Sequence, residues 1–154
     1  MNIVVLIPVF NDAGALAKTL ASLEVVGGYS KVVLVDDGSE FPIELPEGYS
    51  FEIDIVHLAM NVGVEHALNY GLDYILKEDV DFIARLDSGD LVKSNRFELQ
   101  TEYLLANPDV SVVGSYVDVV DQKGRLLYQQ KYPLYHEDIV KGFKFQNQLC
   151  HPAV

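Results

Sequence analysis

The sequence predicts an α/β fold in three layers, with a mostly parallel β-sheet between two layers of helices, and three observations support this prediction. Short, continuous runs of branched apolar residues are typical of parallel strands that are covered on both faces. Segments with helical apolar spacing lie between these runs, so strand and helix alternate along the chain. Acidic and polar clusters follow several of the runs, at the strand ends where ligands bind in such sheets.

The first half of the chain is expected to form three strands and two helices. The opening run Ile3–Val9 is continuous and apolar, as a buried strand requires. The next segment has leucines at helical spacing, a capping residue at Asn11 or Asp12, and a terminating Gly27-Gly28 pair. The elements expected in this half are strands at 3–9, 31–36 and 51–58, the helix that ends at Gly27, a helix at 64–76, and a loop at 41–49.

The second half is expected to add a fourth strand, a third helix and a β-hairpin. The run at 80–86 leads directly into Asp87, and a helix at 94–106 stops before Asn107-Pro108, because proline is common just beyond a helix end. A strand-like segment at 110–120, a turn at 121–124 and a segment at 125–130 predict the hairpin. From Pro133 the sequence indicates a short helix or a loop. The whole chain, residues 1–154, is interpreted as one domain.

Composition and charge narrow the classes of function. Hydrophobic residues make up 49% and charged residues 22% of the chain, which is ordinary globular usage and argues against disorder. The formal net charge of −12 repels phosphate backbones, so we expect no nucleic-acid partner. An anionic ligand such as a nucleotide diphosphate needs a bound cation or local backbone N–H groups to offset this charge.

Two further features concern the cell compartment. The apolar opening Ile3–Val9 is too short to span a membrane and follows no basic stretch, so we expect neither a transmembrane segment nor a signal peptide. Cys150 is the only cysteine, which excludes an internal disulfide and indicates a reducing compartment. We therefore expect a cytoplasmic protein.

A pair of adjacent carboxylates follows the second expected strand. Asp36 and Asp37 precede Gly38 and Ser39, so two acidic side chains stand where a strand ends. A carboxylate at this place is suited to accept the N–H of a pyrimidine base or a ribose hydroxyl. The alternative is loop capping, in which Asp and Ser side chains bond nearby backbone N–H groups.

A second acidic cluster follows the fourth expected strand. Asp87 and Asp90 supply carboxylate oxygens that suit Mg²⁺ or Mn²⁺. Arg85 beside them supplies a guanidinium that suits phosphate or a base. The alternative is an ordinary turn in which Asp90 caps the following helix.

Together these segments resemble the family 2 glycosyltransferases, in order along almost the whole chain. The matching motifs are Pro8-Val9-Phe10-Asn11, Asp36-Asp37-Gly38-Ser39, Asn61-x-Gly63 with Ala67-x-Asn69-x-Gly71, Arg85-x-Asp87-x-x-Asp90, Arg96-x-x-x-Gln100, Asn107-Pro108-Asp109-Val110, Val113-Gly114-Ser115 and His151-Pro152. Each motif is modest, but their order and spacing together are specific. The resemblance implies a GT-A fold, the fold of nucleotide-diphospho-sugar transferases.

By this resemblance the donor is a nucleotide-diphospho-sugar, most often linked to UDP, and transfer is a single inverting displacement onto a glycan or lipid-linked acceptor. The resemblance also implies that Asp87 and Asp90 hold a metal, Mn²⁺ or Mg²⁺, which in turn holds the diphosphate. It implies a role in building a surface polysaccharide or lipid-linked glycan, in a full-length enzyme peripheral to the inner membrane face. The residues it assigns to the donor nucleotide are Pro8, Phe10, Asn11, Asp36, Asp37, Asn61, Gly63, Arg85 and Asp87.

The sequence departs from the family pattern at two points. Gly89 stands where the family usually carries the second Asp of its metal motif, so metal is expected to bind mainly together with the nucleotide. Gly89→Asp is expected to raise metal affinity, provided that position 89 does not need a positive φ. The family's catalytic base is an Asp or Glu downstream of the His-Pro segment and is expected beyond Val154. We therefore expect this chain to bind UDP without transferring sugar.

Two other classes of protein remain as alternatives. A sugar-phosphate nucleotidyltransferase shares the layered architecture, but it needs a basic, glycine-rich loop after the first strand, and residues 10–14 carry no Lys or Arg. A non-catalytic nucleotide-binding or receiver-like module also places acidic residues at strand ends. Such a module favours a lone Asp at the end of a central strand, and Asp87 is not alone.

Overall fold

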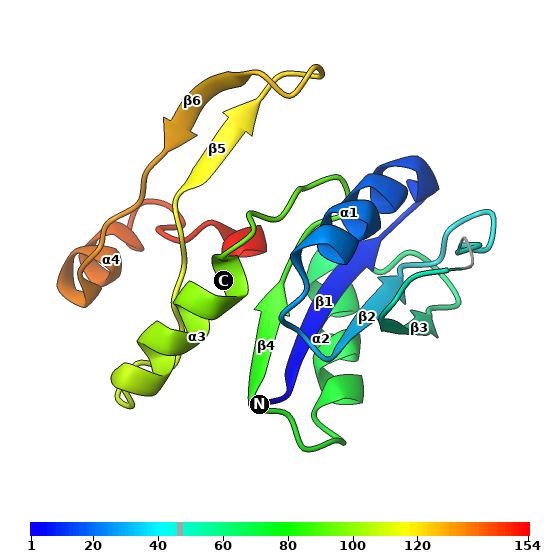
Figure 1. The fold of residues 1–154 in the computed structure, drawn as a ribbon, viewed down its shortest axis with the longest axis horizontal. Helices are drawn as coiled ribbons and strands as arrows, with labels where there is room; N and C mark the ends of the chain where they lie inside the picture. The colour runs from blue at the N-terminus through cyan, green and yellow to red at the C-terminus, as the bar shows by residue number, and fades with distance from the viewer. Residues whose placement is uncertain (46–47) are drawn as a thin grey trace.

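The computed structural model describes residues 1–45 and 48–154 and shows a four-stranded parallel sheet with a separate hairpin (Figure 1). The sheet has the strand order β3-β2-β1-β4, and all three neighbouring pairs are parallel. Its strands are β1 (Ile3–Val9), β2 (Lys31–Asp36), β3 (Glu52–His57) and β4 (Phe82–Arg85). The four expected strands are thus confirmed, with β3 and β4 shorter than expected.

The parallel register brings the carboxyl ends of the strands to one edge of the sheet. Val9 of β1 lies beside Asp36 of β2, and Asp36 in turn lies beside His57 of β3. Arg85, the last residue of β4, pairs with Leu6, so the chain beyond Arg85 runs along the last residues of β1. The polar clusters that follow these strands are therefore neighbours in space.

Helices cover both faces of the sheet. α1 (Ala13–Val26) and the first turn of α3 (Arg96–Ala106) pack on one face, and α2 (Val64–Ile75) packs on the other (Figure 1). The buried side chains of these helices are Leu16, Leu20, Leu23 and Phe97 on the first face, and Ala67, Leu68 and Ile75 on the second. The two separate cores confirm the expected three-layer arrangement.

Asp12 is the residue that caps α1. Its Oδ1 accepts the N–H of Ala15 at 3.1 Å, which satisfies one of the free donors of the first turn. Gly27 ends the helix with φ of 62°, a left-handed conformation that glycine adopts without strain. Of the two expected capping residues, Asn11 and Asp12, the structure selects the second.

Gly71 lets α2 lie close to the sheet. A Cβ at this position would stand 2.4 Å from Cδ1 of Leu6 and 2.8 Å from Cγ2 of Val35. Gly71→Ala therefore overpacks a buried helix–sheet contact, and we expect it to lower the free energy of unfolding by about 1–3 kcal/mol in urea titrations. Gly14 is the matched control, because a Cβ there meets nothing within 4 Å. Equal stability of the two alanine variants would contradict this account of α2.

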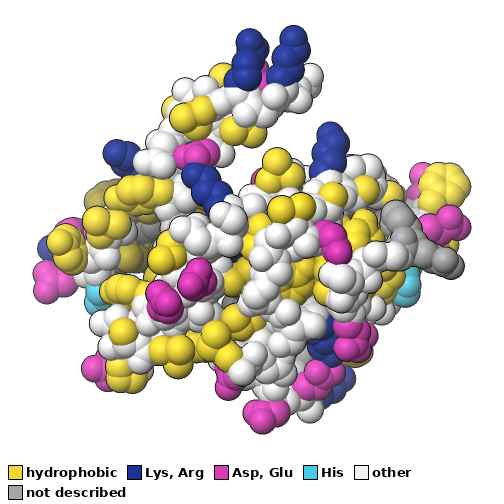
Figure 2. Space-filling model, in the orientation of Figure 1, with side chains coloured by type: hydrophobic (Ala, Val, Ile, Leu, Met, Phe, Trp, Pro, Cys, Tyr) yellow, Lys and Arg dark blue, Asp and Glu magenta, His cyan; other side chains and the backbone are white. Residues whose placement is uncertain are grey.

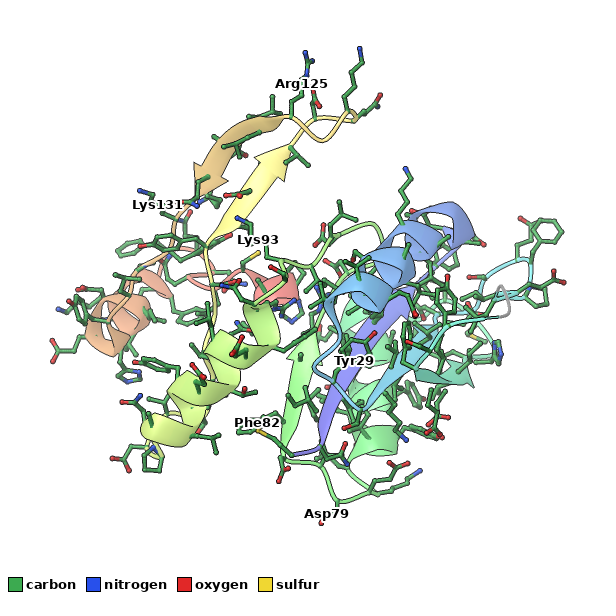
Figure 3. The ribbon with its side chains drawn as sticks, in the orientation of Figure 1. Tyr29, Asp79, Phe82, Lys93, Arg125 and Lys131 are labelled. Carbon is green, nitrogen blue, oxygen red and sulfur yellow. The ribbon has the colours of Figure 1, made fainter. Side chains whose placement is uncertain are left out.

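The hairpin consists of β5 (Val117–Val120) and β6 (Leu126–Gln130), and it projects away from the sheet (Figure 1). Asp121 holds its turn, because its Oδ1 accepts the N–H groups of Lys123 and Arg125. Figure 2 shows apolar side chains along the hairpin and Lys and Arg side chains at its tip, where Figure 3 labels Arg125. The expected hairpin and its turn are confirmed.

The expected strand at 110–120 is wrong for its first seven residues. The N–H of Val110 bonds to the carbonyl of Asn107 in a turn, and the carbonyl of Val113 accepts from the Gln100 side chain of α3. This backbone runs beside a helix, so it has no partner strand within the described residues and pairing begins only at Val117.

The last part of the chain contains two short helices, α4 (His136–Gly142) and the 3₁₀ helix η1 (His151–Ala153). They confirm the short helix or loop expected after Pro133. Of the expected loop at 41–49, residues 46 and 47 lie outside the described residues, and the others form no helix or strand. Among the helices that the structure describes, none is long and apolar enough to cross a membrane.

Candidate functional site

Bonds between side chains and backbone link the loops after β1 and β2. The N–H of Asn11 donates to Oγ of Ser39 at 2.9 Å, and Oδ1 of Asn11 accepts the N–H of Glu40 at 2.8 Å. Asn11 has φ of 52°, a left-handed conformation that Asn tolerates better than most residues. Next to it, the Phe10 ring is 46% exposed. The structure thus gives Asn11 a role in joining two loops and leaves the Phe10 ring free for contact.

Asp36 is almost fully buried and is bonded by groups of the protein itself. Its Oδ1 accepts the N–H of Ser39 at 3.0 Å, and its Oδ2 lies 3.1 Å from Nδ1 of His57. Burial raises the pKa of the Asp36 carboxyl, but the hydrogen bonds from Ser39 and His57 outweigh burial, so the pKa lies below its ordinary value. Asp36 is therefore an ionised anchor for its loop.

Asp37 joins the loop after β2 to the turn that begins α2. Its Oδ1 accepts the N–H of Val62 at 2.8 Å, and its Oδ2 accepts the N–H of Gly63 at 3.0 Å. A carboxylate has about four acceptor positions, so Asp37 keeps capacity for further donors. Asp37 therefore caps a loop, as the alternative interpretation expected, and its role in nucleotide binding stays a prediction.

Gly38 brings the same two loops into close contact. It has φ of 72°, and a Cβ at this position would stand 2.3 Å from the backbone carbon of Met60. No residue with a side chain fits here without moving the segment that leads into Asn61. The Asp-Asp-Gly-Ser motif is thus packed backbone to backbone against the Asn61–Gly63 turn.

The loop after β4 is built around Arg85 and Asp87. Nη2 of Arg85 lies 2.6 Å from Oδ1 of Asp87, and the Arg85 residue is only 6% exposed. Within the described residues, Nε and Nη1 of Arg85 and Oγ of Ser88 are buried without a hydrogen-bond partner. Buried polar atoms are normally satisfied, so this end of the loop has unused capacity for a ligand or water.

α1 holds this loop in place through one hydroxyl group. Oγ1 of Thr19 accepts the N–H of Gly89 at 2.8 Å and donates to the carbonyl of Asp90 at 2.9 Å. Gly89 has φ of 97°, which is a strained conformation for any residue with a Cβ. The condition attached to Gly89→Asp is therefore not met, and this substitution is no longer expected to give a clean gain in metal affinity.

Asp87 and Asp90 are close enough for their charges to interact. Burial raises the pKa of the Asp90 carboxyl, and the charge of Asp87 raises it further. A cation between the two carboxylates would relieve both effects, and the role of this pair in metal binding stays a prediction. In the part of the chain that the structure describes, no three His, Cys, Asp or Glu side chains gather as a metal site, so other ligands would have to complete the coordination.

A cavity of about 340 Å³ lies at this edge of the sheet, and we call it the strand-end cavity. It is lined by Pro8, Val9, Phe10, Asp12, Asp37, Asn61, Gly63, Val64, Asp87 and Ser88. Its volume is at the lower end of the range for small-molecule sites, roughly 300–1,000 Å³. An aromatic ring, backbone turns and three aspartates thus surround one cavity of ligand size.

The strand-end cavity unites six of the ten predicted site residues. These are Pro8, Phe10, Asp37, Asn61, Gly63 and Asp87, whereas Asn11, Asp36, Arg85 and Asp90 are not among its lining residues. Sequence reasoning missed Val9, Asp12, Val64 and Ser88 as lining residues. It also missed the contact of His57 with Asp36, for which the signal was the position of His57 at the end of the neighbouring parallel strand.

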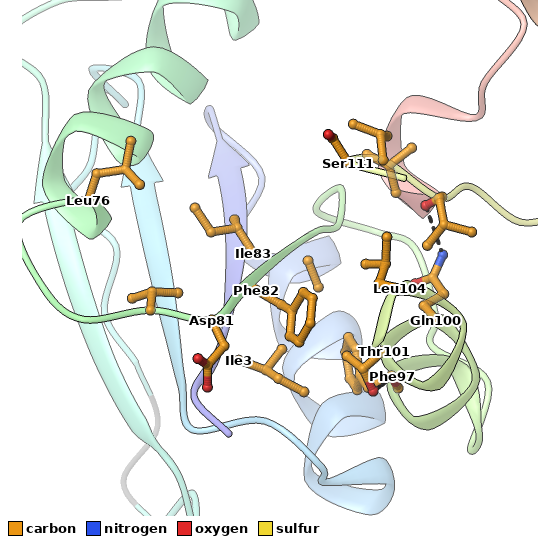
Figure 4. Close-up of a pocket in the computed structure, with 15 residues that line it drawn as sticks. Ile3, Leu76, Asp81, Phe82, Ile83, Phe97, Gln100, Thr101, Leu104 and Ser111 are labelled. Atoms are coloured by element: carbon orange, nitrogen blue, oxygen red, sulfur yellow. Dashed lines mark hydrogen bonds between the residues drawn. The ribbon is translucent and has the colours of Figure 1, made fainter. Parts of the chain in front are cut away.

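A second cavity, of about 350 Å³, lies between β4 and α3 (Figure 4). Most of its lining is apolar, including Ile3, Phe82, Phe97 and Leu104. None of the predicted site residues lines it, and the acidic clusters lie at the other cavity. The chemistry of the candidate site therefore belongs to the strand-end cavity.

Comparisons with known proteins agree with this architecture. Three solved structures of S. aureus TarS share the fold with TM-scores of 0.54 to 0.55 at 15% to 19% sequence identity. The match to one TarS structure covers 69% of this chain and 20% of the TarS chain. The matches to TarS 1–349, alone and in complex with UDP, each cover 81% of this chain and 43% of the TarS chain. The chain thus spans less than half the length of these proteins. No curated protein matches the chain.

The sequence profile described as glycosyl transferase family 2 matches residues 4–153, almost the entire chain. This match confirms the resemblance that the ordered motifs indicate, and the solved structures confirm the GT-A type of fold. The chain therefore belongs to glycosyl transferase family 2.

Proposed function

We propose that this chain is the donor-binding part of an inverting glycosyltransferase that uses a UDP-linked sugar. The observation that carries the proposal is the strand-end cavity, in which the exposed Phe10 ring, Asp37 and Asp87 face one space. Support comes from the family match over residues 4–153 and from the UDP complex of TarS 1–349, a structural neighbour. Acceptors of the glycan or lipid-linked class, and a cytoplasmic location, remain parts of this proposal.

We assign the nucleoside to the end of the cavity that contains Phe10. Its ring offers a stacking surface for a pyrimidine, and aromatic stacking contributes about 1–3 kcal/mol per base. Asp37 offers acceptor capacity for the base N–H or a ribose hydroxyl, and two backbone N–H groups fix its orientation. Pro8, Asn61 and Gly63 complete the walls.

We assign the diphosphate to the end that contains Asp87. When bound, Mn²⁺ or Mg²⁺ held by Asp87 and Asp90 would neutralise the diphosphate that leaves during transfer. Arg85 orients Asp87 through the 2.6 Å ion pair and adds positive charge beneath the site. Thr19 holds the backbone of the loop, so both carboxylates stay at this edge.

Nucleotide titrations test this proposal. We expect calorimetry to show UDP binding more tightly than GDP or CMP, and binding to strengthen when Mn²⁺ is present, because the cation offsets the acidic site. The preference over GDP reflects a cavity that holds a pyrimidine, and the preference over CMP reflects both the base and the second phosphate. A chain that binds none of the three, or that prefers GDP, would contradict the proposal.

A further inference from the structure

Two polar side chains of α3 bind backbone groups next to the candidate site. Nη2 of Arg96 donates to the carbonyl of Arg85 at 2.7 Å and to that of Val154 at 2.9 Å. Nε2 of Gln100 donates to the carbonyl of Ala153 at 2.9 Å, and its Oε1 accepts from Nε of Arg96 at 3.0 Å. Figure 4 shows the Gln100 side chain on α3, and its Nε2 also donates to the carbonyl of Val113 at 3.4 Å. This Arg96–Gln100 pair thus joins η1 to the end of β4.

Hydrogen bonds hold the Arg96–Gln100 pair in a fixed position. Burial lowers the pKa of Arg96 to about 10, and burying a guanidinium costs free energy that hydrogen bonds to its N–H groups offset. The N–H of Arg85 also donates to the carbonyl of Val154 at 2.8 Å. A three-residue 3₁₀ helix has little stability of its own, so these bonds determine where η1 lies.

This arrangement places η1, whose first residue is His151, beside the end of β4, and His151 itself is not among the residues that line the strand-end cavity. The His151 side chain is exposed, and its imidazole lies within reach of the charges of Arg85 and Asp87. Partial burial and the charge of Arg85 hold the pKa of His151 below its ordinary value, despite the opposing effect of Asp87. The lowered pKa favours the neutral imidazole, which carries one N–H donor.

Arg96 and Lys93 are bonded to other groups, whereas Arg85 pairs with Asp87 and, among the described residues, keeps Nε and Nη1 without a partner. Arg85 is buried and directs Nη2 to Asp87. Arg96 is occupied with the two carbonyls, and Lys93 pairs with Asp118. An exposed hydrogen-bond donor is valuable here, because the acidic chain otherwise repels a diphosphate. His151 supplies such a donor from the segment that Arg96 and Gln100 hold.

We propose that His151 binds the diphosphate of the donor, and that Arg96 and Gln100 are positioning residues that hold His151 beside Asp87. This inference rests on the proposed function, because it assigns the diphosphate to the Asp87 end of the strand-end cavity.

The first experiment compares UDP with uridine. Calorimetry on the parent chain, His151→Ala and His151→Gln is expected to show about tenfold weaker UDP binding for the alanine variant, with uridine binding unchanged. Gln keeps an N–H donor, so His151→Gln should recover part of the loss. His136→Ala, which removes an exposed histidine on α4, is the matched control. Unchanged UDP binding by His151→Ala, or an equal loss for UDP and uridine, would overturn the proposal.

The second experiment tests the positioning role. Gln100→Met keeps the size of the side chain but removes its hydrogen bonds, and leaves Arg96 to maintain the fold. We expect Gln100→Met to weaken UDP binding in the parent but to add no further loss to His151→Ala, because both changes act through the same imidazole. Additive losses would show that Gln100 does not act through His151.

A third measurement separates this inference from the proposed function. If the parent binds UDP and His151→Ala binds it equally well, the inference fails while the proposed function stands. If the parent binds no nucleotide, NMR spectra of the histidine rings with inorganic pyrophosphate and Mg²⁺ test whether His151 forms an anion site. A shift of the His151 signals without a shift of the His136 signals supports the anion site, and the absence of any shift rejects it.

Discussion

Gly38→Ala is expected to lower the free energy of unfolding by about 2–5 kcal/mol and to weaken UDP binding more than tenfold. A left-handed conformation costs a residue with a Cβ about 1–2 kcal/mol, and overpacking adds about 1–3 kcal/mol. The added Cβ meets the backbone of Met60, 2.3 Å away, so the Asn61–Gly63 turn must move. Because Asp37 binds two N–H groups of that turn, the nucleoside end of the cavity moves as well.

Gly124→Ala is the matched control for this prediction. Gly124 has φ of 76°, close to the 72° of Gly38, but a Cβ there meets nothing within 4 Å. The control therefore includes the conformational cost without the backbone contact. Urea unfolding and UDP titration of both variants would test the account, and equal effects of the two substitutions would refute it.

Asp87→Asn is expected to abolish the coupling between Mn²⁺ and UDP. In the parent, each ligand should tighten binding of the other by the same factor, typically about 5–150-fold for coupled sites. Asn keeps an oxygen acceptor for Nη2 of Arg85, so the loop remains bonded while the charge that attracts the cation is lost. Titrations of Mn²⁺ with and without UDP would show a coupling factor near 1 in the variant, as no coupling is then left.

Asp109→Asn serves as the control, because Asp109 is an exposed carboxylate outside the lining of the strand-end cavity. It should leave the coupling as in the parent. If the parent shows no coupling and Asp87→Asn binds UDP unchanged, the Asp87 cluster is an ordinary turn and the role of a metal must be abandoned.

The sequence predicted β1 and β2 to the residue, because both are covered on both faces and read as unbroken apolar runs. The segment 110–116 is equally rich in valine, yet it forms no strand. A strand forms there only if a neighbouring strand is available for pairing. That depends on contacts between residues far apart in the sequence, which a local sequence pattern does not show. The same limit applies to α1, where the pattern allowed two caps and only the packed loop distinguished Asp12 from Asn11.

The candidate site was predictable to the level of clusters, because parallel strands bring their carboxyl ends to one edge. The sequence did not show which of two adjacent aspartates faces the cavity. Asp36 is the last residue of β2 and turns to His57, whereas Asp37 reaches the next loop. The sequence also did not show that Gly89 has a positive φ, because glycine adopts positive and negative φ values.

Several of the bonds that hold the loops around the strand-end cavity join a side chain to a main-chain group. Asp37 binds the N–H groups of Val62 and Gly63, and Thr19 binds the N–H of Gly89 and the carbonyl of Asp90. Nearly every residue type offers these backbone groups. During evolution, a position such as 62 can therefore accept new side chains while Asp37 and Thr19 cannot be exchanged as freely. A framework of this kind tolerates wide sequence drift, in keeping with the 15% to 19% identity at which the fold recurs in TarS.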